Sequence, residues 1–311
     1  MQVLVTGGAG FIGSHLVDGL LERGDDVVVL DDLATGLAAN VPDAARFVEG
    51  DVTDEVALAK AIDGCDLVFH QAALGSVTRS VAQPRVSDRA NVAGTVAVLD
   101  AAQRTGVRRV VLASSSSVYG GATEVPTRES APLVPRSPYA VTKLTGEHYA
   151  RVFWELHGLE TVCLRYFNVF GPRQRPDTQY AAVIPLFIDA LLSGRAPVVH
   201  GDGLQSRDFT YVADTVQANL RAAAAPAEAC AGRAFNIARG RPASLLDLLA
   251  ALGAELGVEV VPDHAPSRPG DVRHSHADIG AARSQLGYEP AVSLEDGLAR
   301  TMAWFRDRRR A

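Results

Sequence analysis

The chain has 311 residues, of which 47% are apolar, and a formal net charge of −6. This length can bury a large core, and we interpret it as a nucleotide-binding domain followed by a smaller lobe. The acidic balance argues against nucleic acid as a partner because neutralising phosphates needs a basic surface. No apolar run is long enough to predict a membrane span. The three cysteines are odd in number and predict buried thiols in a reducing cytoplasm rather than disulfides.

Short β-rich segments alternate with helical patterns through the first half of the chain. This alternation predicts a Rossmann-type α/β fold, in which a doubly wound parallel sheet carries helices on both faces. Open parallel sheets bind ligands at the carboxyl edge of their strands, so a site is expected there. The predicted strands are residues 2–6, 26–30, 67–70, 109–113 and 161–167, and the predicted helices are residues 12–23, 55–62, 89–104 and 139–156.

The composition of the sequence changes from about Gly171, where proline, glycine and arginine become frequent and the segments become shorter. We interpret residues 171–311 as mainly a mixed α/β lobe that binds substrate, and residues 1–170 as the dinucleotide-binding domain, to which some later segments return. The substrate is expected between the two. The shorter segments of this half are residues 181–192, 198–201, 234–237, 244–256 and 294–308.

A glycine pattern follows the first predicted strand and opens a helix, which is the context in which such a pattern predicts a dinucleotide site. Its spacing is G-x-x-G-x-x-G. Gly7 permits a tight turn, Gly10 lets the backbone approach a pyrophosphate, and Gly13 lets helix and strand pack closely. The residues of this glycine loop predicted to bind the cofactor are Gly7, Gly10, Phe11, Ile12 and Gly13.

Acidic residues follow the next two strands. Asp31 and Asp32 end the second strand, where a carboxylate accepts hydrogen bonds from ribose hydroxyls and repels a 2'-phosphate. The cofactor is therefore expected to be NAD rather than NADP. Asp51 and Val52 follow a third strand and could bond the adenine edge, although an acid at a strand end is also common in ordinary turns.

A tyrosine and a lysine share one face of the predicted helix over residues 139–156. Tyr139 and Lys143 stand four residues apart, which places both side chains within reach of one ligand. A lysine ammonium stabilises a phenolate, so we expect the tyrosine pKa to fall and the tyrosine to act as a base. The strand before this helix ends in four serines, residues 114–117, whose hydroxyls could bridge substrate and tyrosine.

The chain resembles the extended short-chain dehydrogenases, and within them the UDP-hexose 4-epimerases, from end to end. The segments that carry the resemblance are TGGAGFIG, GDVTD, HQAALGSV, SSSSVYG, SPYAVTK, LRYFNVFGP, RDFTYVAD and RPGDVRHS. The resemblance implies that Ser115 relays a proton, that Tyr139 is the base, and that Lys143 tunes it and binds the nicotinamide ribose. It implies no metal. It also assigns Ala72, Leu74 and Asn91 to the cofactor, and Ser115, Ser117, Tyr139, Asn168, Arg207, Arg268, Asp271 and Ser275 to the UDP-sugar.

The reaction implied by the resemblance is inversion at C4' of a UDP-hexose through a transient 4-keto sugar, with hydride passing to NAD and back. Dehydration of the sugar is disfavoured because no carboxylate adjoins Ser115 in the sequence. A uronate epimerase or decarboxylase stays open, since Arg173 and Arg175 could meet a sugar carboxylate. A regulator that binds NAD without chemistry is the alternative from another class, and it would not need the base.

Two further expectations concern substrate size and assembly. Ser275 stands where many UDP-glucose enzymes of the family carry a tyrosine, so we expect room for a 2-acetamido group and turnover of UDP-GlcNAc and UDP-GalNAc besides UDP-glucose and UDP-galactose. The alternative is that Ser275 is an ordinary loop residue. The family usually forms homodimers through two helices per subunit, which residues 91–104 and 147–156 would supply, although their apolar faces could equally be core.

Overall fold

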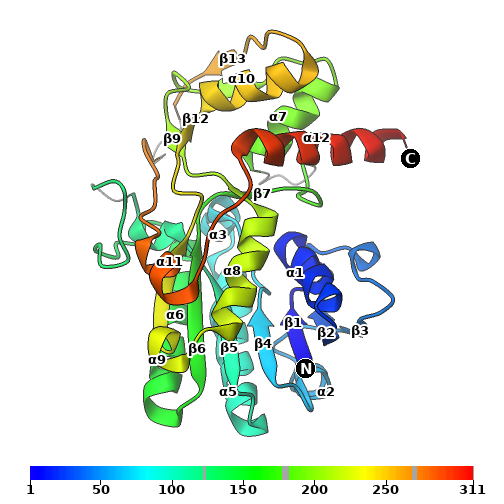
Figure 1. The fold of residues 1–311 in the computed structure, drawn as a ribbon, viewed down its shortest axis with the longest axis vertical. Helices are drawn as coiled ribbons and strands as arrows, with labels where there is room; N and C mark the ends of the chain where they lie inside the picture. The colour runs from blue at the N-terminus through cyan, green and yellow to red at the C-terminus, as the bar shows by residue number, and fades with distance from the viewer. Residues whose placement is uncertain (122–123, 177–181, 268–271, 311) are drawn as a thin grey trace.

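The computed structural model describes residues 1–121, 124–176, 182–267 and 272–310 (Figure 1). Its centre is a sheet of seven parallel strands in the order β11-β6-β5-β4-β1-β2-β3. This is the strand order of a doubly wound dinucleotide-binding sheet with one added edge strand, which confirms the predicted fold class. The strands are β1 (Gln2–Thr6), β2 (Asp26–Asp31), β3 (Arg46–Glu49), β4 (Leu67–His70), β5 (Arg109–Ser115), β6 (Glu160–Tyr166) and β11 (Arg233–Ile237).

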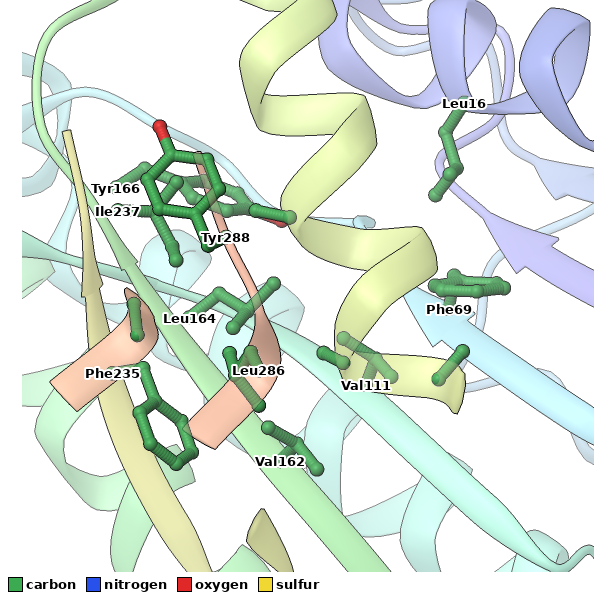
Figure 2. Close-up of a cluster of buried hydrophobic side chains, with 14 of the residues drawn as sticks. Leu16, Phe69, Val111, Val162, Leu164, Tyr166, Phe235, Ile237, Leu286 and Tyr288 are labelled. Atoms are coloured by element: carbon green, nitrogen blue, oxygen red, sulfur yellow. The ribbon is translucent and has the colours of Figure 1, made fainter. Parts of the chain in front are cut away.

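Helices cover both faces of the sheet because successive strand side chains point to opposite faces. In β1, Val3 and Val5 belong to one buried cluster and Leu4 to the other. Figure 2 shows part of the first cluster, in which Tyr288 and Leu286 lie over strand residue Leu164. The first face carries α1 (Phe11–Glu22), α8 (Val212–Ala224) and α11 (Gly280–Leu286), and the second carries α2 (Glu55–Ile62), α5 (Gly94–Thr105) and α6 (Pro138–His157).

A smaller lobe with its own apolar core lies beyond the carboxyl edge of the sheet, at the top of Figure 1. Three helices supply most of this core, with Phe187, Leu248 and Met302 among its buried side chains. Short strand pairs, one parallel and one antiparallel, complete the mixed α/β lobe. Its elements are α7 (Val183–Leu192), α10 (Leu245–Leu256), α12 (Leu294–Arg310), β8 (Val198–His200), β13 (Asp263–Ala265), β9 (Ser206–Arg207) and β12 (Ala243–Ser244).

The remaining elements connect the two parts or lie at the edge of the sheet. The strands β7 (Val169–Phe170) and β10 (Thr210–Tyr211) pair in parallel where the chain enters and leaves the lobe. The helices α3 (Val77–Ala82), α4 (Pro84–Asp88) and α9 (Ala227–Cys230) are short, as are the 3₁₀ turns Ala38–Asn40 and Ser116–Tyr119.

Two features of the fold differ from the predicted elements. The helix predicted over residues 89–104 begins with a π-helical turn, Arg89–Ala93, which continues α4 into α5. Such turns re-aim side chains near functional sites. In addition, α8 was not predicted, and both α8 and β11 return from the second half of the chain to the main sheet.

The three cysteines, Cys65, Cys163 and Cys230, are buried and unpaired, as predicted. Within the described ranges, no helix combines the length and apolarity that crossing a membrane requires.

A buried arginine holds α8 against the sheet. Arg109 of β5 is 2% exposed, and its guanidinium donates to the carbonyl oxygens of Ala222, Ala223 and Ala225, at 2.7, 3.0 and 2.7 Å. These carbonyls belong to the C-terminal end of α8, where a helix leaves acceptors unpaired. The same guanidinium forms an ion pair with Glu160 at 2.6 Å. Arg109 therefore links β5, β6 and α8.

We predict that Arg109→Ala lowers the free energy of unfolding by about 3 to 5 kcal/mol, because it leaves a part-buried carboxylate and several helix carbonyls without partners. Arg108→Ala is the matched control. Arg108 also pairs with Glu160, at 3.3 Å, but its side chain is 48% exposed, so about 0.5 kcal/mol is expected. Urea unfolding followed by circular dichroism measures both, and equal losses would contradict this account.

Candidate active site

A large cleft of about 1600 Å³ lies between the carboxyl edge of the sheet and the lobe. Its floor is formed by the loops that follow β1, β2, β4 and β5, and the lobe contributes Arg207, His274 and Ser275. The cleft is therefore at the place where β1 and β4 diverge in sequence order, the usual ligand position of this architecture. It is long enough to bring residues from both halves of the chain to one ligand or to two adjacent ligands.

The glycine loop (residues 7–13) leaves no room for a side chain at its first and last glycines. Gly7 has a φ of +72°, and a Cβ built on it would lie 2.6 Å from the backbone nitrogen of Ala72. A Cβ on Gly13 would lie 2.1 Å from the Gly7 carbonyl oxygen. Both positions therefore require glycine. Gly10 is less crowded, with the same oxygen 3.2 Å from its ideal Cβ.

The N-terminus of α1 opens onto the cleft. Gly10 is its N-cap and supplies no side-chain hydrogen bond, so the first amides of the helix are left for an external acceptor. All five predicted residues of the glycine loop line the cleft. Unpaired helix amides without side chains in front of them fit the pyrophosphate of a dinucleotide. The residues present thus suit NAD.

Acidic side chains mark the other side of this part of the cleft. Asp31 accepts from the backbone nitrogens of Ala9 and Leu33, both at 2.9 Å, and so ties the glycine loop to the end of β2. Burial raises the pKa of Asp31, and these backbone hydrogen bonds oppose that shift. Each carboxylate oxygen keeps a lone pair for a ribose hydroxyl. Asp51 and Val52 also line the cleft, and Asp51 accepts from the backbone nitrogen of Thr53 at 2.8 Å.

Asn91 differs from its predicted role. Ala72 and Leu74 line the cleft, but Asn91 does not and is only 2% exposed. Its Oδ1 accepts from the Leu74 backbone nitrogen at 2.8 Å, and its Nδ2 donates to the Thr142 hydroxyl at 3.0 Å. The π-helical turn directs this side chain inward. Asn91 therefore holds the Leu74 loop in place from behind the wall of the cleft.

A buried histidine also ties these elements together. Thr95 donates to the Asn91 carbonyl at 2.6 Å, so its hydroxyl oxygen accepts from Nε2 of His70, 3.0 Å away. Nδ1 of His70 is then the acceptor for the Thr6 hydroxyl at 2.8 Å. Burial lowers the pKa of His70 to about 3, which keeps the imidazole neutral. A neutral imidazole with one donor and one acceptor thus joins β1, β4 and α5.

Ser115, Tyr139 and Lys143 meet at the end of β5. Lys143 donates to the Ala113 carbonyl at 2.8 Å, and its Nζ lies 6.0 Å from the centre of the Tyr139 ring. Burial raises the pKa of Tyr139, and a hydrogen bond with Ser115 opposes that shift. Burial outweighs this hydrogen bond, so the pKa of Tyr139 is raised and not lowered as the sequence led us to expect. Burial also lowers the pKa of Lys143, to about 8.

The predicted substrate residues that the structure describes come together in the cleft. Ser117 and Asn168 line it from the ends of β5 and β6, and Arg207 and Ser275 line it from the lobe. Asn168 has a φ of +35°, and its carbonyl accepts from Thr210 at 3.2 Å. The Ser117 hydroxyl is buried without a hydrogen-bond partner among the described residues. Arg268 and Asp271 lie outside the described residues.

Several residues that line the cleft were not predicted. Thr127 follows a proline in an aperiodic segment, so nothing in the sequence marked it. Tyr119 and His274 lie inside quoted motifs, and Arg136 and Gln174 stand beside two others, so these four could have been identified from them. The lining residues missed in this way include Tyr119, Thr127, Arg136, Gln174 and His274.

We predict that Gly7→Ala abolishes NAD binding, because its Cβ would displace the end of β4. Gly24→Ala is the matched control. Gly24 also has a positive φ, +84°, but a Cβ there meets nothing within 4 Å, so the expected cost is about 1 to 2 kcal/mol of stability with unchanged NAD affinity. Isothermal titration with NAD measures both affinities. Tight binding by the Gly7 variant would contradict the role of the close approach.

Known proteins of similar sequence and structure identify the family to which this arrangement belongs. UDP-glucose 4-epimerase of Mycolicibacterium smegmatis is 41% identical over 99% of both chains. UDP-glucose 4-epimerase of Thermotoga maritima, solved with UDP-glucose, superposes with a TM-score of 0.95 at 38% identity over 99% of both chains. UDP-N-acetylglucosamine 4-epimerase of Methanobrevibacter ruminantium, solved with UDP-N-acetylmuramic acid, has a TM-score of 0.93 at 38% identity, covering 99% of this chain and 98% of that one. Residues 3–238 match the model of the NAD dependent epimerase/dehydratase family, to which this chain belongs.

Proposed function

We propose that the protein is an NAD-dependent UDP-hexose 4-epimerase. The observation that carries this proposal is that Ser115, Tyr139 and Lys143 share one cleft with the glycine loop and with Arg207 of the lobe. A base, a dinucleotide cradle and a cation for a diphosphate are the parts this reaction needs. The two epimerases that superpose on nearly the whole chain support the same assignment. The N-terminal part, residues 1–170, would bind NAD, and residues 171–311 would mainly bind the UDP-sugar.

The side chains at the end of β5 perform the proton chemistry. NAD, when bound, supplies the redox capacity that oxidises C4' and later reduces it. Tyr139 takes the proton of the 4'-hydroxyl, through Ser115, with which it is hydrogen bonded, and returns it when the sugar is reduced. The Lys143 ammonium stabilises the phenolate that forms. Arg207, on the lobe side of the cleft, would hold the diphosphate while the sugar presents its other face.

The distribution of carboxylates favours epimerisation over dehydration. Loss of the sugar 6-hydroxyl needs an acid beside the relay hydroxyl. Among the described residues that line the cleft, the carboxylates are Asp31, Asp32 and Asp51, which follow β2 and β3. The residues after Ser115 in the 3₁₀ turn are serines. No described acid is therefore placed to expel the hydroxyl.

Arg173 and Arg175 were candidates for binding the carboxylate of a uronate substrate, but the structure does not support that role. Arg173 forms an ion pair with Asp18 of α1 at 2.7 Å, and neither Arg173 nor Arg175 lines the cleft. A neutral hexose is thus the better substrate.

The alternative function without catalysis, a regulator that senses NAD, would not need Ser115, Tyr139 and Lys143 to be assembled. The absence of any disulfide among the three cysteines supports a reducing cytoplasm as the location.

An exposed apolar stripe on α6 supports a homodimer. Val141, Tyr149, Val152 and Leu156 are exposed at helical spacing along this helix, and Val86 is exposed on α4, which packs beside it. A stripe of this kind is costly in water unless a partner covers it. We propose that a second copy of the chain packs on it. The contact would use α6 with α4, rather than the face expected over residues 91–104.

We predict that Tyr139→Phe lowers kcat by about 10²- to 10⁴-fold, since it removes the base. NAD should stay bound in the purified variant, because the phenol is not part of the glycine loop. Tyr149→Phe, on the same helix, is the matched control and should keep full activity. Epimer formation is followed by NMR, and NAD is quantified after denaturation of protein purified without added cofactor. Full turnover by the Tyr139 variant would refute the base assignment.

We predict that Ser275→Tyr removes activity on UDP-GlcNAc by more than about tenfold and leaves activity on UDP-glucose within about twofold, because the larger side chain fills the space for an acetamido group. Ser275→Ala should keep both activities. The measurement is kcat/KM on each substrate. Equal loss on both substrates would show that Ser275 does not set the size of the pocket.

We predict that a double variant, Val152→Asp with Leu156→Asp, is monomeric, because it places two charges in the proposed interface. Val56→Asp on α2 is the control, since Val56 is 78% exposed and Leu156 is 73% exposed. Light scattering coupled to gel filtration gives the mass of each. A dimeric double variant would overturn the proposed surface.

A further inference from the structure

The helix that carries Tyr139 and Lys143 is attached to the end of β5 at two points one helical turn apart. Lys143 donates to the Ala113 carbonyl, and Glu147 accepts from the hydroxyl of Ser114. Tyr139, Lys143 and Glu147 are spaced four residues apart and so share one face of α6. Ser114 directly precedes Ser115. Glu147 thus contacts the residue next to the hydroxyl that meets Tyr139.

Glu147 is itself held rigidly. Its side chain is 8% exposed and that of its partner Arg165 is 5% exposed. Nε and Nη2 of Arg165 donate to the two carboxylate oxygens at 2.9 and 2.7 Å. Nη1 donates to the Tyr119 hydroxyl at 2.7 Å and to the Glu129 carbonyl at 3.2 Å. Arg165 holds both oxygens of the Glu147 carboxylate and is itself held by Tyr119 and Glu129. The carboxylate therefore has one position available to it.

The hydrogen bonds continue from Arg165 through Tyr119 to the wall of the cleft where the sugar is expected. Tyr119 donates to Oδ1 of Asn236 at 2.7 Å, and Nδ2 of Asn236 donates to the carbonyls of Thr127 and Asp278 at 3.0 and 3.1 Å. Tyr119 and Thr127 both line the cleft. The same network therefore runs from Ser114, next to Ser115, to two residues of the cleft wall.

Stability alone does not account for an ion pair at this place. Replacing a buried ion pair by apolar residues of similar volume is often neutral or stabilising. The site between α6, β5 and β6 could be filled by apolar side chains, as the surrounding core is. Apolar side chains would not, however, hold the Ser114 hydroxyl in one orientation.

We infer that Glu147 is a positioning residue of the reaction: held by Arg165, its carboxylate anchors Ser114 and thereby fixes the end of β5 from which Ser115 reaches Tyr139. The inference rests on the proposed roles of Ser115, Tyr139 and Lys143. It adds that the geometry between these three depends on a side chain that touches neither substrate nor cofactor. Small displacements of reacting groups lower rates strongly, so the anchor should be visible in kcat.

Glu147 also contributes charge. Lys143 faces Glu147 and Tyr139 on its own helix, His70 of β4 and Cys163 of β6. His70 is neutral, and burial raises the pKa of the Cys163 thiol well above its usual range. Burial lowers the pKa of Lys143, and Cys163 and then Glu147 oppose that shift. Because the raised pKa of the Cys163 thiol keeps it protonated, Glu147 is the one of these neighbours that carries a negative charge.

The first test removes the anchor and leaves the ion pair intact. Ser114→Ala is expected to lower kcat about tenfold with KM for the UDP-sugar within about twofold. The matched control is Thr161→Val, which removes another buried hydroxyl between α6 and the sheet, bonded to the Ala150 carbonyl at 2.7 Å. The control should lose stability without losing kcat. If both variants lose similar stability and neither loses kcat, Ser114 and Glu147 are merely structural.

The second test removes the charge. Glu147→Gln in the NAD-loaded enzyme is expected to lower kcat and to move the basic limb of its pH profile to lower pH by about one unit, because Lys143 loses its proton sooner. A profile that is scaled down without moving would overturn the contribution of charge. If this variant does not fold, the comparison of Ser114→Ala with Thr161→Val decides.

Failure of this inference is distinguishable from failure of the proposed function. If Tyr139→Phe is inactive and Ser114→Ala is fully active, the base assignment stands and the positioning role is wrong. If Tyr139→Phe is active, the proposed chemistry itself fails, whatever the Ser114 variant does.

Discussion

The close approach of the glycine loop to the end of β4 is the constraint on which the site depends. With no side chain at positions 7 and 13, the backbone of the loop packs on Ala72 and on itself. Gly10, the N-cap of α1, supplies no side-chain hydrogen bond to the amides at the start of that helix. Asp31 secures the loop from the β2 side, and the hydrogen bonds of His70 with Thr6 and Thr95 secure β1 and β4 to α5. The backbone of the glycine loop and the acids at the strand ends thus shape the cofactor side of the cleft.

The opposite side is built from side chains and is held differently. Its reacting groups lie on one helix and one strand end, and buried polar contacts fix their separation. The described carboxylates of the cleft, Asp31, Asp32 and Asp51, lie at the ends of β2 and β3. Arg89 also lines the cleft and lies 4.0 Å from Asp51, whereas Arg207 belongs to the lobe. The acids suit ribose hydroxyls, and Arg207 suits a diphosphate. One cleft can therefore orient a dinucleotide and a nucleotide sugar toward each other.

Much of this arrangement was predictable because it follows from local patterns. Strand β4 and helix α2 have the bounds that their hydrophobic periods indicated, and the glycine loop requires the residues that its spacing marks. What escaped prediction depends on distant contacts. Asn91 looked like a ligand residue, but the π-helical turn directs it to Leu74. The pKa of Tyr139 depends on how deeply α6 is buried, which no spacing reveals. Glu147 is an ordinary helix acid in the sequence, and only the fold places Ser114 and Arg165 on it.

The central claim is that hydrogen leaves C4' of the sugar and returns to the same carbon within one enzyme-bound cycle. The most direct measurement is to incubate the protein with UDP-glucose deuterated at C4 in ordinary water and to analyse both epimers by NMR. The account predicts that deuterium stays on C4 of the UDP-galactose formed as well as of the remaining substrate. Epimerisation accompanied by loss of the label to water would contradict it.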